Sequence, residues 1–251
     1  MSDFSHPLYL LHGWGIGRAA WAPVVDCLAE THPALRVNLL DLPGYAGSEA
    51  CADFAAAART LAASLPAGAI LCAWSLGAEL ALCAARLAPE KFAGLVLVGA
   101  TPAFVQQSGW PHAQPPSLLD NFTAAVAADP AGALQRFVAL FNQGDTQARA
   151  IARQLARALK ATALPEAATL LAGLNWLRDA DLRAELAALA TPTLLVHGAH
   201  DPLMPLAAAR WLAQTLPHAR LEVFADAAHA PFLHAPERFA ALVGDFCHAS
   251  A

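Results

Sequence analysis

Six short apolar segments that alternate with helical patterns constrain the fold more than any other feature of this sequence. We expect strands at residues 8–11, 36–40, 69–73, 94–98, 193–196 and 221–224. Such alternation predicts a mostly parallel sheet with helices on both faces, because each parallel connection must cross back over the sheet. A length of 251 residues fits one α/β domain with an insertion better than two domains.

The alternation stops between the fourth and fifth expected strands. Residues 101–190 contain helical patterns and loops, and residues 101–116 are rich in Pro, Gln, Ser and Gly, as in a crossing loop. We therefore expect residues 1–100 and 191–251 to form the α/β core and residues 101–190 to form an inserted helical lid. Insertions of this kind commonly build a substrate pocket.

Composition excludes several classes of protein. Apolar residues make up 57% of the chain, but Pro, Gly or charged residues interrupt every long apolar stretch, which indicates a core and not a membrane span. The N-terminal residues lack the basic region of a signal peptide, so we expect a cytoplasmic protein. Five scattered cysteines suggest neither a disulfide framework nor a zinc site, and a net charge of −5 argues against nucleic acid as a partner.

Ser75 lies in a pattern typical of a nucleophile elbow. The pentapeptide Ala-Trp-Ser-Leu-Gly at 73–77 follows an expected strand and precedes a helical pattern at 78–87. A sharp strand-to-helix turn exposes the serine hydroxyl and needs small neighbours. Ala73 replaces the first glycine of the usual Gly-x-Ser-x-Gly pattern with another small residue. The structural alternative is a serine that only caps a helix.

Two residues further along the chain can activate this serine. A serine hydroxyl is a poor nucleophile at neutral pH, so it needs a base that a carboxylate orients. Asp201 follows the fifth expected strand and His229 follows the sixth, which places both on loops at the carboxyl edge of the sheet. The order Ser, Asp, His is the order such a sheet uses. We identify Ser75 as the nucleophile, His229 as the base and Asp201 as the orienting acid.

Alternatives remain for two of these roles. The competing bases are His200 and His234, and the competing acid is Asp226. Asp201 could also serve only as the cap of a helix that begins near Pro205. We prefer His229 because it alone follows the last strand in a loop of small residues.

The tetrahedral intermediate of acyl transfer needs two hydrogen-bond donors aimed at its oxyanion. One is expected to be the backbone N–H of Leu76, directly after the nucleophile, and the other a backbone N–H of an early loop. The segment His-Gly-Trp-Gly at 12–15 supplies that loop, with Trp14 as donor and its indole free to line the acyl pocket. A phosphate-binding loop is a weak alternative, because the glycine patterns of such loops are missing.

With these residues in place, the chain resembles the α/β-hydrolase superfamily and, within it, the pimeloyl-[acyl-carrier protein] methyl ester esterases of biotin synthesis, the BioH family. The segments that carry the resemblance are residues 11–15, 41–44, 74–77, 110–111, 136–140, 157–160, 181–183 and 227–232. They extend over nearly the whole chain. The triad motifs are general to the superfamily, whereas Trp-Ser-Leu-Gly combined with His-Gly-Trp-Gly and Arg-Phe-x-Ala-Leu is much narrower.

The resemblance implies hydrolysis of the methyl ester of pimeloyl-[acyl-carrier protein] to the free carboxylate and methanol, without a metal or an organic cofactor. It also implies a set of substrate contacts: Trp14, Ser75, Leu76, Phe137, Val138, Ala139, Leu140, Phe141 and His229. Phe141 stands where a polar residue is expected, which changes the polarity of the pocket. The alternatives are a broad carboxylesterase, a lactonase or carbon–carbon hydrolase, and a hydrolase-like protein that binds a ligand without cleaving it.

A basic segment of the expected lid fits an acidic carrier protein. Arg149, Arg153 and Arg157 recur at i, i+4 spacing, with Lys160 after them and Arg136 before them. Residues 136–160 contain five basic residues and one acid, so the segment has a charge of +4 in a chain of −5. Local positive charge steers an acidic partner even when the whole protein is anionic. The resemblance implies that Arg136, Arg149, Arg153 and Arg157 hold the carrier, although a solvated helix face is the simpler alternative. We expect a monomer that binds neither membrane nor nucleic acid.

Overall fold

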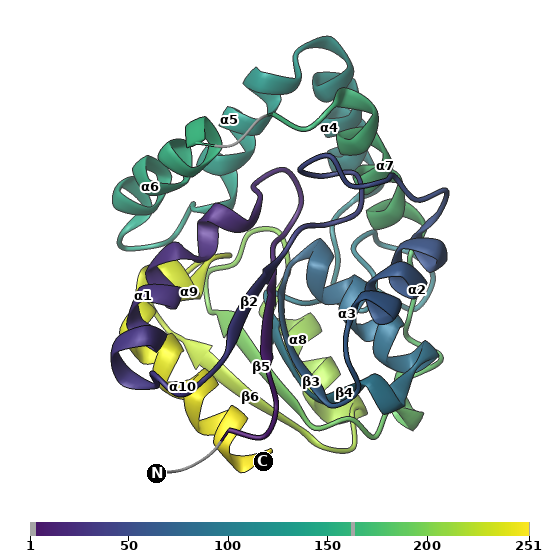
Figure 1. Cartoon of the computed structure of the whole chain (residues 1–251). Coiled ribbons are helices and arrows are strands. Elements are labelled where there is room, and N and C mark those ends of the chain that lie inside the picture. Colours follow the sequence, from purple (N-terminus) through teal and green to yellow (C-terminus); the bar gives the residue numbers. More distant parts are fainter. Residues whose placement is uncertain (1–3, 162–163, 251) are drawn as a thin grey trace.

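The computed structural model describes residues 4–161 and 164–250 and contains one six-stranded sheet in which every pairing is parallel (Figure 1). The strand order is β2-β1-β3-β4-β5-β6. The strands are β1 Leu8–Leu11, β2 Val37–Leu40, β3 Ala69–Trp74, β4 Phe92–Val98, β5 Thr193–Gly198 and β6 Ala219–Phe224. All six expected strands are therefore present, with small shifts at their ends.

Burial explains why the inner strands were easy to recognise. Every residue of β3 and β5 is buried, whereas the edge strands β2 and β6 are largely part-exposed. Parallel strands covered by helices on both faces read as continuous apolar runs rather than alternating ones. The apolar residues of β3 and β4 thus form the centre of the core.

Helices cover both faces of the sheet. The core helices are α1 Ala22–Thr31, α2 Phe54–Ser64, α3 Leu76–Leu87, α8 Leu206–Thr215, α9 Pro231–His234 and α10 Pro236–Ala249, with short 3₁₀ turns at Arg18–Trp21, Pro89–Lys91 and Leu186–Ala188. Across the sheet, β2 lies on one side of β1. In contrast, β4 lies on the opposite side of β3, and β6 lies on that same opposite side of β5. Right-handed crossovers then place α1 on one face and α3 and α8 on the opposite face. Helix α10 packs beside α1, and α2 packs beside α3.

Four helices lie between β4 and β5 and arch over the carboxyl edge of the strands (Figure 1). They are α4 Pro116–Ala128, α5 Pro130–Phe141, α6 Ala148–Ala161 and α7 Ala167–Asp179, and we call them the insertion helices. A sharp corner joins the first two, because Asp129 caps α5 through the N–H of Gly132 and Pro130 occupies its first turn. Among the described helices, none combines the length and apolarity that crossing a lipid bilayer requires.

Candidate active site

Ser75 lies in the tight turn between β3 and α3. Its backbone angles, φ 57° and ψ −124°, are rare for a residue other than glycine, and such strain is typical of a nucleophile elbow. The Ser75 side chain makes no capping hydrogen bond to α3, which leaves its hydroxyl available. Gly77 is required here, because a Cβ at this position would lie 2.5 Å from the carbonyl oxygen of His12. The elbow therefore packs directly against the loop that follows β1.

His229 and Asp201 form a buried pair at the same edge of the sheet. His229 Nδ1 lies 2.6 Å from Asp201 Oδ2, and both side chains are fully buried. Because a carboxylate only accepts, Nδ1 carries the proton and Nε2 keeps its lone pair. His229 Nε2 has no hydrogen-bond partner among the described residues. An unpaired imidazole nitrogen held in this tautomer is what a general base requires.

Charge around Asp201 keeps it ionised. Burial raises the pKa of Asp201, but the interactions with His229 and His197 and the backbone N–H of Met204 together lower it by more, so that the net pKa lies below its usual range. Asp201 Oδ1 accepts hydrogen bonds from the backbone N–H groups of Leu203 and Met204 at 2.9 and 2.8 Å. Asp201 therefore caps the turn before α8 with one oxygen and orients His229 with the other.

Contacts with the elbow bring His229 towards Ser75. The indole N–H of Trp74, the residue before the nucleophile, donates to the carbonyl oxygen of His229 at 2.9 Å. The imidazole also lies against the end of β4, where a Cβ on Gly99 would be 3.0 Å from the ring. His229 Nε2 is not hydrogen-bonded to Ser75 here, and in sites without substrate this bond is often long.

The competing residues have other surroundings. His200 and Asp226 are exposed. His234 Nδ1 lies 2.9 Å from Asp145 Oδ1, a carboxylate of the insertion. The structure thus pairs His229, and not His200 or His234, with Asp201.

The predicted oxyanion loop is held from several sides. His12 Nδ1 donates to the carbonyl of Gly13 at 2.8 Å, and its Nε2 accepts from the N–H of Leu42 at 3.1 Å. In the same loop, the backbone N–H of Gly15 donates to the Tyr45 hydroxyl at 2.8 Å. No hydrogen bond between described residues uses the backbone N–H of Trp14, the predicted donor.

The indole of Trp14 both lines a cavity and bonds to the insertion. Its N–H donates to the carbonyl oxygen of Leu170 in α7 at 2.8 Å, so the ring is anchored and not free. The cavity beside Ser75 has a volume of only about 20 Å³, which is room for about one water molecule. Apart from Ser75, every residue that lines it is apolar.

The predicted substrate contacts divide into three groups. Trp14, Ser75 and Phe137 line the cavity. Phe141 instead contacts His229: its carbonyl accepts the backbone N–H of His229 at 3.3 Å, and its ring contacts the Trp74 and His229 rings. The remaining predicted residues do not line the cavity: Leu76, Val138 and His229 are buried, Leu140 is half-buried and Ala139 is exposed.

Several lining residues were not expected from the sequence. They are Phe104, Leu119, Phe122, Leu174, Leu177, Leu203 and Met204. They come from four separate segments, and each looks like an ordinary core residue in its own helix or turn. A local motif could not have identified them.

His197 was also missed. It is buried in β5, with its Nε2 2.7 Å from the carbonyl oxygen of Met204 and 3.7 Å from Asp201 Oδ2. The signal in the sequence was a histidine inside an apolar strand, four residues before the acid.

Within the described part of the chain, no cluster of three His, Cys, Asp or Glu side chains could hold a metal ion.

The arginines expected to dock a carrier protein are all exposed. Arg149, Arg153 and Arg157 share one face of α6, and Arg136 lies on α5. The opposite face of α6 buries Ile151, Leu155 and Ala158. Helix α6 thus separates a basic outer face from an apolar inner face.

Comparisons with known proteins identify the family of this chain. The profile of the alpha/beta hydrolase fold matches residues 6–236. The pimeloyl-[acyl-carrier protein] methyl ester esterase of Aromatoleum aromaticum is 44% identical over 95% of this chain and 96% of its own length. The enzyme of the same name from Nitrosomonas europaea is 40% identical over 92% of each chain.

Solved structures share the fold at low identity. An esterase from Exiguobacterium antarcticum superimposes with a TM-score of 0.84 at 23% identity, covering 98% of this chain and 93% of its own. An enol-lactonase from Burkholderia xenovorans gives a TM-score of 0.79 at 22% identity, covering 96% and 91%. These likenesses show the fold, and the sequence relatives show the narrower group. The chain belongs to the α/β-hydrolase family and, within it, to the pimeloyl-[acyl-carrier protein] methyl ester esterases.

Proposed function

We propose that this chain is a serine carboxylesterase that hydrolyses the methyl ester of pimeloyl-[acyl-carrier protein] to pimeloyl-[acyl-carrier protein] and methanol in biotin synthesis. The observation that carries the proposal is the buried Asp201–His229 pair beside the strained turn at Ser75. The names of the relatives supply the substrate. We further propose that the reaction takes place in the cytoplasm, where acyl carrier proteins act.

The geometry supports a two-step mechanism without a cofactor. Ser75 Oγ attacks the ester carbonyl while His229 Nε2 takes the hydroxyl proton, and Asp201 stabilises the imidazolium that forms. The backbone N–H groups of Trp14 and Leu76 donate to the oxyanion. The C–O bond to the methoxy group then breaks, and methanol leaves with the proton from His229. Water, activated by the same imidazole, hydrolyses the acyl-enzyme and restores Ser75.

The size of the cavity supports a role for residues 101–190 as a movable lid. A volume of about 20 Å³ holds about one water molecule, whereas pockets for small ligands have about 300–1,000 Å³. We therefore propose that the insertion helices shift to admit an acyl chain to Ser75. The apolar lining, with Phe122 and Phe137 from two of these helices, suits the methylene chain of a dicarboxylate ester.

The exposed basic face of α6 supports docking of the carrier. Acyl carrier proteins are strongly acidic, and complementary charge raises the rate of encounter and fixes orientation. We propose that Arg136, Arg149, Arg153 and Arg157 contact the carrier. The apolar inner face of α6 packs on the core, so these arginines can change without loss of the fold.

Replacing Ser75 with alanine tests the mechanism. Ser75→Ala is expected to lower kcat by about 10⁴-fold or more, because no other group near His229 can form the acyl-enzyme. Turnover is measured as loss of one CH₂ from the mass of the carrier-bound substrate. A fluorophosphonate probe should label the native chain and a Ser64→Ala control, but not Ser75→Ala.

The same assay separates the proposed function from its alternatives. A Ser75→Ala variant that keeps most of its activity would exclude the mechanism. A native chain that the probe does not label would indicate a binding protein without catalysis. Equal kcat/KM for short esters and for the carrier-bound ester would indicate a broad carboxylesterase or lactonase.

A further inference from the structure

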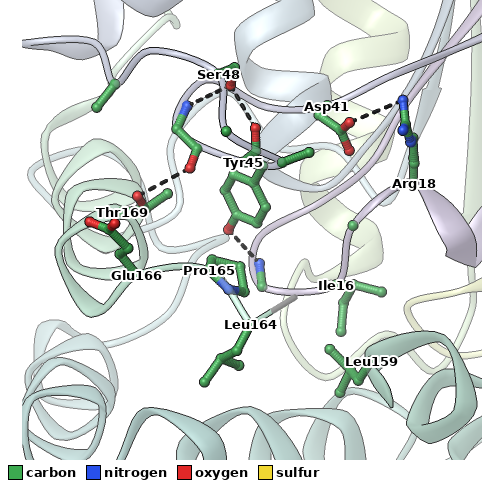
Figure 2. Close-up of a pocket in the computed structure, with 16 residues that line it drawn as sticks. Ile16, Arg18, Asp41, Tyr45, Ser48, Leu159, Leu164, Pro165, Glu166 and Thr169 are labelled. Atoms are coloured by element: carbon green, nitrogen blue, oxygen red, sulfur yellow. Dashed lines mark hydrogen bonds and ion pairs between the residues drawn. The ribbon is translucent and has the colours of Figure 1, made fainter. Parts of the chain in front are cut away.

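The loops that follow β1 and β2 are joined at two points. These strands are parallel neighbours, so both loops begin at the same edge of the sheet. At the first point, the backbone N–H of Leu42 donates to His12 Nε2 at 3.1 Å. At the second, the backbone N–H of Gly15 donates to the Tyr45 hydroxyl at 2.8 Å (Figure 2). Trp14, whose backbone N–H is the proposed oxyanion donor, lies between the two points in sequence.

His12 holds the peptide that carries this donor. The N–H of Trp14 and the carbonyl of Gly13 belong to one planar peptide, so fixing the carbonyl also fixes the N–H. His12 Nδ1 donates to the Gly13 carbonyl oxygen at 2.8 Å. A Cβ on Gly13 would lie 3.0 Å from the Cβ of Ser75, so the peptide packs directly against the nucleophile. A small rotation of the peptide would therefore change the distance between the Trp14 N–H and an oxyanion formed at Ser75.

Tyr45 contacts the residues on both sides of this peptide. Its ring lies against the His12 ring, with centroids 4.9 Å apart and planes at 62°. Its hydroxyl accepts the Gly15 N–H, the first donor after Trp14. The side chain is buried, and burial raises the pKa of Tyr45, so the hydroxyl stays a neutral acceptor at neutral pH. Tyr45 thus restrains the segment before and after the proposed donor.

Several hydrogen bonds hold the turn that carries Tyr45. The Tyr45 carbonyl accepts from the backbone N–H of Ser48 at 2.9 Å and from its hydroxyl at 2.7 Å. The carbonyl of Gly44 accepts from the hydroxyl of Thr169 in α7 at 3.3 Å (Figure 2). Gly15 and Tyr45 also line a hollow of about 710 Å³, which water can enter. A water molecule in place of the hydroxyl would satisfy Gly15 but would not be attached to this turn.

We propose that Tyr45 is a positioning residue, which holds the oxyanion loop, residues 12–15, so that the backbone N–H of Trp14 is aimed at the tetrahedral intermediate. This inference rests on the proposed function, because that function requires Ser75 to form such an intermediate. Tyr45 does not line the cavity beside Ser75, so it acts through His12 and Gly15. Loss of its hydroxyl should weaken binding of the transition state and not of the substrate.

Tyr45→Phe removes the hydroxyl and keeps the ring that lies against His12. The matched control is Tyr9→Phe, which removes the hydroxyl of the other tyrosine of the chain, half-buried in β1. In Tyr45→Phe, kcat for p-nitrophenyl butanoate is expected to fall about tenfold, with KM changed by about twofold or less. The donor is misaligned and not lost, and complete loss of an oxyanion donor costs about 100-fold or more. Tyr9→Phe should keep the native kcat.

A transition-state analogue measures the geometry of the oxyanion loop directly. Ser75 Oγ adds to the carbonyl carbon of butyl trifluoromethyl ketone, its proton passes to His229, and the carbonyl oxygen becomes the oxyanion of a hemiketal. The Ki of this ketone should rise about tenfold in Tyr45→Phe, in parallel with the fall in kcat. Butyl methyl ketone is much less electrophilic and binds as the free ketone, so its Ki should stay at the native value.

The outcomes separate this inference from the function on which it rests. If the native chain cleaves neither the carrier-bound methyl ester nor p-nitrophenyl butanoate, the proposed function fails. If the native chain cleaves both but Tyr45→Phe matches Tyr9→Phe in kcat and in the Ki of the fluoroketone, the function stands and the role of Tyr45 is overturned. A lower melting temperature of Tyr45→Phe with native kcat, or equal increases in Ki for both ketones, would also overturn it.

Discussion

Asp201 has two buried histidine neighbours. His229 Nδ1 lies 2.6 Å from Oδ2, and His197 Nε2 lies 3.7 Å from the same oxygen. Burial lowers the pKa of His197, which keeps this second ring neutral at neutral pH. Because a carbonyl only accepts, His197 Nε2–H donates to Met204, whose own N–H holds Asp201 Oδ1. His197 is thus a positioning residue for the proposed acid.

Removing this donor should affect catalysis and not only stability. His197→Phe leaves the Met204 carbonyl unpaired and frees the turn that holds Asp201, so we expect kcat to fall about tenfold, about 1.4 kcal/mol, with little change in KM. The acid-side midpoint of the kcat/KM pH profile should also shift. His197→Gln, which can still donate, should recover part of kcat. A lower melting temperature with unchanged kcat and pH profile would reduce His197 to a structural role.

Glu79, one turn after Ser75, is a buried carboxyl group without a hydrogen-bond partner among the described residues. Burial raises the pKa of Glu79 well above its usual value. Over a range of pH the carboxyl group is therefore protonated in the folded state and ionised in the unfolded state. The unfolded state then binds fewer protons, and stability falls as pH rises above about 4.3 until the folded pKa is reached.

Glu79→Gln should therefore flatten the pH dependence of stability. The native chain is expected to lose up to about 1.4 kcal/mol of unfolding free energy per pH unit from this group, and the variant none. Urea unfolding at pH 5, 6 and 7 measures both slopes. Glu90→Gln, an exposed control, should keep the native slope, and parallel slopes for native and Glu79→Gln would contradict the assignment.

The sequence predicted residues that a local motif identifies and missed those that only the fold assembles. Ser75, Asp201 and His229 each follow a strand in a recognisable segment, and the structure brings the latter two into contact. His197 and Glu79 carry no motif, because their importance comes from neighbours that the tertiary structure supplies. The roles of all five remain predictions for mutagenesis.

At the scale of elements, α6 has two faces with different roles. Its inner face buries Ile151 and Leu155, while its outer face exposes Arg149, Arg153 and Arg157. A helix whose apolar face is packed tolerates charge reversal on the exposed face, where each substitution changes stability by about 0.5 kcal/mol or less. Effects on a charged partner can then be measured without loss of the fold.

Charge reversal on this face should weaken only the carrier-bound substrate. Arg149→Glu with Arg153→Glu is expected to raise KM for the carrier-bound methyl ester about tenfold and to leave a p-nitrophenyl ester nearly unaffected. Added salt should reduce the difference, because exposed charges are screened. The control reverses two exposed arginines elsewhere, Arg59 and Arg210. Equal changes for both substrates, or for both double variants, would remove the docking proposal.

The strands were predicted better than the insertion. The central strands β3 and β5 are buried throughout and were visible as short apolar runs, whereas the edge strands β2 and β6 include polar residues. The sequence indicated helices in residues 101–190, but not how α4 to α7 pack. That arrangement depends on contacts such as Trp14 with Leu170, which lie 156 residues apart. Patterns of hydrophobicity do not encode such pairings.

At the scale of the whole molecule, one acid of the insertion holds the loop of the proposed base. Asp145, the single acid of the basic segment, is buried between α5 and α6. Its Oδ2 accepts the backbone N–H of Ala228 at 3.0 Å, directly before His229, and its Oδ1 lies 2.9 Å from His234 Nδ1. The insertion and the loops after β6 are therefore coupled at the carboxyl edge of the sheet.

Breaking this coupling should cost both stability and activity. Asp145→Ala leaves the buried N–H of Ala228 without a partner, which costs about 1–3 kcal/mol of unfolding free energy, and it frees the His229 loop, so kcat should fall. Asp129→Ala removes an exposed cap of α5 and costs about 1 kcal/mol, but it does not touch that loop. Urea unfolding and kcat for a p-nitrophenyl ester distinguish the two variants. Only Asp145→Ala should lower kcat; if Asp129→Ala lowers it equally, general loosening of the insertion, and not the contact with Ala228, controls the position of the base.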